Sequence, residues 1–362
     1  MRHQPILACA VLLATAWTPT AATGQSAAPR AWTVPRTPEG HPDLQGNWTN
    51  ATLTGLQRPA GLPLVLTKEQ VAKLEKIRSD SIEKLSKASD PNRTAPPVGG
   101  DGSTGAAGNV GGYNYFWIDA GDRVAIVNGE FRSSFLTDPA NGRVPPMTAA
   151  GRARMAERFG RGRKFGEYDN PENRPLSERC IMSFGSNAGP PMLPNYFYNN
   201  NYTIVQTRDY VMILTEMVHD VRIIPLTTGT RPPGGLQSWM GESVGRWEGD
   251  TLVVVTTNIR ADQLSAFTTS LGAALVGASD SLRVVERFSR PDSNNVLYRF
   301  TVDDPATFTQ PWGGEVPFLR MGDLVYEYAC HEGNYAMSNV LSGARAAERE
   351  AATKKAPPKP KH

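Results

Sequence analysis

Three polar side chains stand in runs of the sequence that are otherwise apolar: His219, Glu286 and Tyr298. Side chains alternate across a β-strand, and each of the three shares its parity with the apolar residues around it, so we expect all three to face inward. A buried carboxyl group resists ionisation and a buried imidazole can stay neutral, which suits proton transfer near neutral pH. The pattern predicts a catalytic site without a cofactor. His219 would be the acid or base, Glu286 its partner, and Tyr298 the hydrogen-bond donor to a developing oxyanion.

The same residues also have a structural interpretation. A single histidine on an apolar face is commonly a core residue, and a buried glutamate commonly pairs with arginine. In the run 210–224 the opposite parity carries Asp220 and Arg222, which we expect to form an ion pair at the surface. Both interpretations stay open from the sequence.

A second cluster of reactive types lies in "YEYACHEGNYAM", residues 326–337. The run "LVYEYAC" is typical of a last strand, and parity then places Cys330 on its buried face and His331 on the opposite face. His331 and Glu332 are therefore second-rank candidates. They gain weight if the strand ends before Cys330 and the turn carries both toward the mouth of a barrel.

The first 24 residues combine a basic start, an apolar run and small residues near their end, which is typical of a secretory signal peptide. Its removal leaves two cysteines, Cys180 and Cys330. In an oxidising compartment an even number favours a disulfide, and two buried free thiols are the alternative. No later segment has the roughly 20 apolar residues of a membrane span. We expect a periplasmic or secreted protein.

Other kinds of chemistry lack their motifs. The histidines of the mature chain show no H-x-H or H-E-x-x-H spacing, so no metal site is predicted. The serines have no nearby base positioned for serine hydrolase chemistry, and the glycine-rich segment lacks the context of a phosphate loop, so no cofactor is predicted. The net charge of +3 comes from 38 basic and 35 acidic residues that are mostly scattered, which argues against a nucleic-acid partner.

The N-terminal region, residues 25–111, is predicted to contain an extended arm, a surface helix and a loop rich in glycine and proline. Thr67 and Gln70 form a capping-box pattern at the start of the helix, which ends before Pro91. Residues 346–362 form a tail that begins as a helix and is disordered at its end. No specific role is expected for this tail.

Residues 112–345 carry repeated strand signals, with a helix at 148–159 and a possible short helix at 266–277. Hairpin turns are indicated at Ala120 to Asp122, Glu248 to Asp250 and Pro291 to Asn295.

Many short strands joined by hairpins, without alternating helices, indicate a mainly β protein. We predict an antiparallel meander that closes into a calycin- or lipocalin-like barrel, or packs as a sandwich, with a few peripheral helices. Aromatic side chains at a barrel mouth would suit an apolar or aromatic small molecule. The leading hypothesis is an isomerase or lyase that works by proton transfer. A binding protein without chemistry and a structural envelope protein are the alternatives.

The runs "PEGHPDLQGNWTNAT", "WMGESVGRWEGDTLVV" and "YEYACHEGNYAM" resemble a family of uncharacterised secreted proteins of soil and aquatic bacteria. The resemblance covers most of the mature chain. It implies export and one continuous β-rich body, and it implies no particular reaction or catalytic residues.

Overall fold

The computed structural model describes residues 32–87, 92, 94, 118–164, 166–182, 189–194, 198–226, 237–260 and 278–355. The predicted signal peptide, the possible helix at 266–277 and the end of the tail lie outside the described residues.

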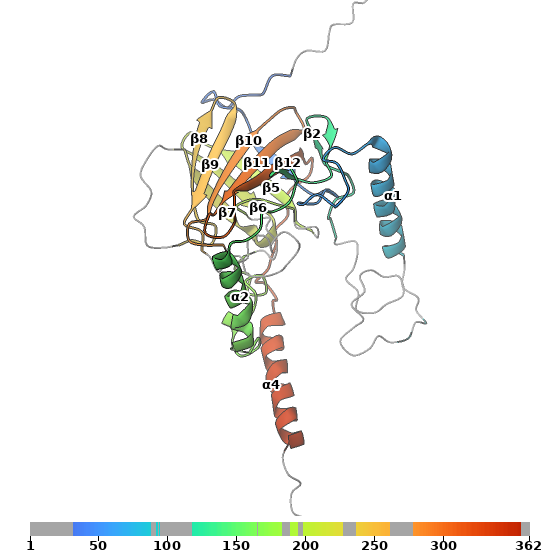
Figure 1. Cartoon of the computed structure of the whole chain (residues 1–362), viewed down its shortest axis with the longest axis vertical. Helices are drawn as coiled ribbons and strands as arrows, with labels where there is room; N and C mark the ends of the chain where they lie inside the picture. The colour runs from blue at the N-terminus through green and yellow to red at the C-terminus, as the bar shows by residue number, and fades with distance from the viewer. Residues whose placement is uncertain are drawn as a thin grey trace, which may run out of the picture. The chain divides into compact units, whose positions relative to one another are not determined.

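Ten antiparallel strands form the main sheet of the described part of the chain (Figure 1). Nine of them follow one another in the order β7-β6-β5-β1-β12-β11-β10-β9-β8, and β4 pairs with β12 beside this series. The strands are β1 (Gly46–Thr49), β4 (Leu136–Asp138), β5 (Asn201–Gln206), β6 (Tyr210–Thr215), β7 (Val221–Pro225), β8 (Glu242–Glu248), β9 (Thr251–Thr257), β10 (Arg283–Ser289), β11 (Asn295–Asp303) and β12 (Trp312–Arg320).

The first and last strands of this series, β7 and β8, come close to each other. Arg222 on β7 donates a hydrogen bond to the Ser243 hydroxyl on β8 at 3.2 Å. A Cβ atom on Gly245 of β8 would lie 3.0 Å from Cγ2 of Ile224 on β7, so glycine permits this approach. The sheet is therefore a nearly closed barrel, and the predicted barrel with peripheral helices is confirmed.

Strands β8 to β12 form an antiparallel meander, and the predicted hairpin turns at 248–250 and 291–295 are confirmed. Strands β5 to β7 form a second meander. Strand β1 joins the two, because Trp48 pairs with Tyr202 on β5 and with Arg320 on β12. The segment predicted as an extended arm thus supplies a strand within the barrel.

Two strand predictions are wrong. The run "LVYEYAC" has no strand, and the last strand is β12 instead. The glycine at position 313 weakens the strand signal of β12 in the sequence. The structure requires glycine there, because a Cβ on Gly313 would lie only 2.2 Å from the Phe300 carbonyl oxygen. Residues 118–125, around the hairpin turn expected at 120–122, also contain no strand, and residues 113–117 of the expected first run lie outside the described residues. A hairpin turn lies instead at Asn128 and Gly129, both with positive φ, between β2 (Ile126–Val127) and β3 (Glu130–Phe131).

Three α-helices lie in the described ranges: α1 (Lys68–Leu85), α2 (Ala149–Lys164) and α4 (Ala336–Lys355). The capping box of α1 is confirmed, because the Gln70 amide donates to the Thr67 hydroxyl and the Gln70 side chain accepts from the Thr67 amide. The predicted helix at 148–159 corresponds to α2. The helix predicted in the tail begins earlier, at Ala336. No helix in the described part of the chain is both long and apolar enough to cross a membrane.

Large side chains fill the inside of the barrel. Fully buried examples from five of the strands are Trp48, Tyr202, Phe288, Tyr298, Trp312 and Phe318. Burying each such side chain contributes about 1.5 to 3 kcal/mol. This packing fixes the positions of the few polar groups among them.

Candidate functional site

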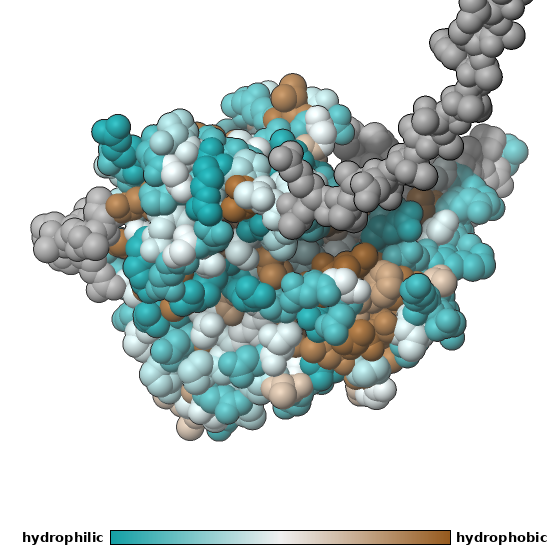
Figure 2. Space-filling view, turned by 90° about the horizontal axis from the view of Figure 1, so that it is seen from above, coloured by the Kyte–Doolittle hydropathy of each residue, from teal (hydrophilic) through white to brown (hydrophobic). Residues whose placement is uncertain are grey.

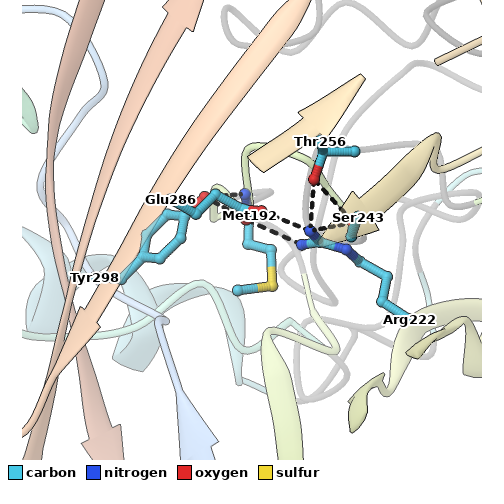
Figure 3. Close-up of polar contacts among 6 residues, drawn as sticks. All are labelled: Met192, Arg222, Ser243, Thr256, Glu286 and Tyr298. Carbon is cyan, nitrogen blue, oxygen red and sulfur yellow. Dashed lines mark hydrogen bonds and ion pairs between the residues drawn. The ribbon is translucent and has the colours of Figure 1, made fainter. Parts of the chain in front are cut away.

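Glu286 and Tyr298 both lie inside the barrel, as their parity predicts, and both are fully buried. They come from neighbouring strands, because Phe288 on β10 pairs with Tyr298 on β11 and Glu286 pairs with Phe300. The Tyr298 hydroxyl donates to Oε1 of Glu286 at 2.9 Å (Figure 3). The same hydroxyl accepts the backbone N–H of Met192 at 2.9 Å, so both of its hydrogen-bonding roles are occupied.

Arg222 approaches the same carboxylate from β7 (Figure 3). Its two terminal nitrogens lie 2.9 Å from Oε1 and 2.5 Å from Oε2 of Glu286. One of them also lies 3.2 Å from each hydroxyl of Ser243 and Thr256. Burial alone would lower the pKa of Arg222, but the charge and the hydrogen bonds of Glu286, together with smaller contributions from Tyr298 and Tyr202, outweigh it and the pKa is raised. The expected surface pair of Arg222 with Asp220 is wrong.

This geometry favours the structural interpretation of Glu286 and Tyr298. The carboxylate is matched by a guanidinium, and the Tyr298 proton is directed at Glu286 rather than at a substrate. Burial and the neighbouring carboxylate raise the pKa of Tyr298, so the phenol stays protonated. A buried Arg–Glu pair of this kind joins β7 to β10 across the barrel.

His219 does not face the barrel interior. It ends a single 3₁₀ turn, η3 (Met217–His219), between β6 and β7, and its side chain is exposed. The run 210–224 is therefore two strands rather than one, and the parity that placed His219 inside does not continue through the turn. Its Nδ1 lies 3.0 Å from the backbone oxygen of Tyr328. The structure thus brings His219 to the loop after β12 and separates it from Glu286 and Tyr298.

That loop, residues 321–335 between β12 and α4, borders a cleft of about 1240 Å³. We call it the tyrosine cleft, because four tyrosines line it: Tyr168, Tyr198, Tyr326 and Tyr328. Its described lining also includes five carboxyl side chains and one guanidinium, from Asp119, Glu178, Glu216, Glu327, Glu332 and Arg174.

The predicted disulfide holds one wall of this cleft. Cys180 and Cys330 are bonded at 2.08 Å, which confirms the pairing. The bond fixes the β12–α4 loop against the segment that carries Glu178. The Asn334 side chain also donates to the Glu178 backbone oxygen at 3.4 Å.

Glu216 forms another wall and is 6% exposed. Its Oε2 accepts the Asn201 side-chain amide at 2.7 Å. Burial raises the pKa of Glu216, although the amides of Asn199 and Asn201 oppose this shift. A carboxyl group that holds its proton more tightly and faces a cleft can serve as a proton donor.

Strained backbone gathers around the tyrosine cleft. Cys180, Asn199, Val218 and His219 all have φ between 47° and 62°. This left-handed conformation is costly for a β-branched residue such as Val218, by about 1 to 3 kcal/mol. Strain of this kind is often retained where it positions functional groups.

The second-rank candidates also belong to this region. Glu332 lines the cleft, and the ring centroid of His331 lies 6.4 Å from that of His219. No strand forms at 324–330, so parity does not separate these residues from Cys330, and the loop carries both to this region. Glu216 and three of the tyrosines, Tyr168, Tyr326 and Tyr328, were not predicted from the sequence as site residues. Disulfide pairing was the available signal, because it brings the segment around Cys180 to the 326–337 motif.

Within the described ranges, no three His, Cys, Asp or Glu side chains are grouped so that they could hold a metal ion. No protein-family model matches the chain, and neither a curated protein sequence nor a solved structure matches it.

Proposed function

We propose that this is an exported protein that binds a small aromatic molecule with a positive charge in the tyrosine cleft. The observation that carries the proposal is the lining of that cleft, with four tyrosines and five carboxyl groups against one guanidinium among the described residues. This ligand class is narrower than the apolar or aromatic small molecule expected from the sequence, because it also requires a positive charge. The site lies beside the barrel end rather than inside the barrel.

The electrostatics of the lining favour a cation. The charge of Arg174 is already matched, because its guanidinium lies 2.8 Å from Glu178 and 2.7 Å from Glu167. Glu216 holds its proton more tightly, so the excess of negative charge comes from the other carboxyl groups, Asp119, Glu327 and Glu332. Tyrosine faces attract organic cations as well as flat rings, at about 0.5 to 1 kcal/mol for each exposed contact.

Export is supported by the predicted signal peptide, by the disulfide between Cys180 and Cys330, and by the resemblance to secreted bacterial proteins. The protein would then meet its ligand in the periplasm or outside the cell.

The binding proposal is tested with two probes that differ in charge, 2-phenylethylammonium and 3-phenylpropionate, by isothermal titration calorimetry. We expect the ammonium to bind more tightly. Tyr326→Ala should weaken it about two- to fivefold, the equivalent of one cation–π contact. Glu332→Gln should weaken it as well, whereas Glu248→Gln should not, because Glu248 lies on β8 and pairs with Arg287. Equal affinity for both probes, or equal effects of both glutamine substitutions, would refute the proposal.

A second candidate is an isomerase or lyase at the same cleft. The observation that favours it is Glu216, a cleft-facing carboxyl group whose pKa is raised by burial. Glu216 would be the proton donor, the role that the sequence suggested for His219. His219 follows it by three residues, at the end of η3.

Proton transfer to or from carbon is visible as deuterium uptake in D₂O. The ligand for this experiment is the molecule that native mass spectrometry detects on protein purified from its own host. We expect NMR to show deuterium entering the ligand with the wild-type protein and not with Glu216→Gln. If Glu216→Gln exchanges as fast as wild type, the enzyme candidate is wrong and the binding proposal is unaffected.

A further inference from the structure

A second cavity, of about 510 Å³, lies on the outer side of the barrel. Its walls are α1, the hairpin of β2 and β3, and the outward side of β11 and β12. We call it the α1 cavity. Figure 2 shows hydrophobic side chains gathered on the surface between the barrel and α1.

The lining of the α1 cavity is mainly apolar. It includes Val71 of α1, Phe131 of β3, Leu297 of β11 and Leu319 of β12. Leu319 is 42% exposed and Ile126 of β2 is 50% exposed, so apolar surface of the cavity is accessible from outside.

Hydrogen bonds fix the position of α1 relative to the segment that leads into β2. Glu75 on α1 accepts the backbone N–H of Val124 at 3.1 Å and the Arg123 guanidinium at 3.3 Å. Arg78 on the same helix donates to the Gly121 backbone oxygen at 3.1 Å. These polar contacts fix α1 beside the segment that leads into β2, at the rim of the cavity. The cavity is therefore preformed, as small-molecule sites usually are.

The one guanidinium in the lining, Arg123, faces Glu75. Both carboxylate oxygens of Asp292 accept hydrogen bonds from the neutral Asn295 side chain, so their hydrogen bonding is satisfied although the charge is not balanced. An anionic ligand would therefore find no unmatched positive charge among the described residues of the lining. An uncharged ligand loses nothing at this rim and covers apolar surface.

We propose that the α1 cavity is a binding site for an uncharged apolar small molecule. The volume is within the range of about 300 to 1,000 Å³ for such sites. A helix about 10 Å wide would fit only about one turn into this space, so the cavity suits a small molecule better than a protein segment. The proposal does not depend on the tyrosine cleft.

The test uses the full chain and the uncharged fluorescent probe N-phenyl-1-naphthylamine. We expect saturable binding to the wild-type protein. Ile126→Trp places a large ring in the cavity and should weaken binding at least about tenfold. Ile223→Trp is the matched control, since Ile223 is 64% exposed on β7 and lies away from the cavity. This control should bind within about twofold of wild type.

A second pair of variants guards against misfolding of the first. Leu319→Asp places a charge in the cavity, and Leu324→Asp makes the same change at a 74% exposed position outside it. Circular dichroism first establishes that each variant is folded. Loss of probe binding with Leu319→Asp and retention with Leu324→Asp would support the site. Unchanged binding in both cavity variants, or equal losses in variants and controls, would overturn it. So would a self-association that disappears with Ile126→Trp while probe binding stays the same.

Discussion

The ion pair between Arg222 and Glu286 gives the sharpest prediction for stability. Arg222→Met removes a guanidinium that contacts both carboxylate oxygens of Glu286 at side-chain exposures of 2% and 0%. The carboxylate would then keep the Tyr298 hydroxyl but lose its balancing charge inside the barrel. Removing one partner of a buried pair costs about 3 to 5 kcal/mol. This is a large part of the roughly 5 to 15 kcal/mol that stabilises an ordinary domain.

The matched control is Arg287→Met on the same strand as Glu286. Arg287 lies 2.8 Å from Glu248, but the two side chains are 44% and 39% exposed. Water screens such a pair, so its loss should cost less than about 1 kcal/mol. The double variant Arg222→Met, Glu286→Leu removes both buried charges and should recover much of the loss of the single variant.

Urea unfolding followed by tryptophan fluorescence and circular dichroism gives the free energies of unfolding of all four proteins. We expect Arg222→Met to be by far the least stable. Binding of 2-phenylethylammonium at the tyrosine cleft should persist in every variant that is folded. If Arg222→Met and Arg287→Met cost the same, or if the double variant is no better than the single one, the reasoning from burial is refuted.

Three further predictions concern other parts of the fold. Burial raises the pKa of Asp220 from 3.8 to about 7 against the opposing charge of His219, so the folded protein holds this proton more tightly than the unfolded chain. The contribution of this carboxyl group to the free energy of unfolding should therefore decrease as the pH rises from about 4 to about 7. Urea titrations should show that Asp220→Asn becomes more stable relative to wild type over the same range. A stability difference between the two proteins that does not change with pH would contradict the assignment. Replacing Cys180 and Cys330 with serine opens a loop of 150 residues and should cost about 5 kcal/mol in the chain-entropy estimate; an unchanged urea midpoint would rule this out. Thr67→Ala removes the cap of α1 and should cost about 1 kcal/mol in thermal unfolding, against no effect if that helix end is frayed.

Local patterns in the sequence were sufficient to predict much of the barrel. The turns at 248–250 and 291–295 have strong hairpin residues, and strand parity between them is uninterrupted. Parity therefore placed Glu286 and Tyr298 inside correctly. The two cysteines that remain after the predicted signal peptide were enough to predict their pairing.

The errors at His219 and Arg222 have one common cause. Parity was carried from β6 into β7, but the turn at 217–219 breaks it, so Arg222 faces inward and Ile223 is 64% exposed. The turn has no glycine, and positive φ values at Val218 and His219 take its place. Valine and histidine rarely adopt positive φ, so the conformational preferences of these residues do not predict this turn.

The tyrosine cleft was beyond sequence reasoning for a different reason. Its lining comes from segments near residues 119, 168–178, 198–201, 216 and 326–340, which become neighbours only through the barrel and the disulfide. Apart from Glu332, which was a second-rank candidate, each carboxyl group among them has the sequence context of an ordinary surface residue.

The distribution of charge separates the two polar regions of this protein. Inside the barrel the carboxylate of Glu286 is matched by Arg222, so the fold itself uses the attraction and little is left for a ligand. Along the tyrosine cleft five carboxyl groups face one guanidinium among the described residues, and that guanidinium also pairs with Glu167 outside the cleft lining. Holding like charges together costs free energy, and binding a cation relieves that cost. A protein that served only as a structural barrel would gain stability by replacing some of these carboxyl groups. Glu327→Gln or Glu332→Gln should therefore raise the free energy of unfolding and weaken the binding of 2-phenylethylammonium. A purely structural role would not produce this opposite response of stability and binding.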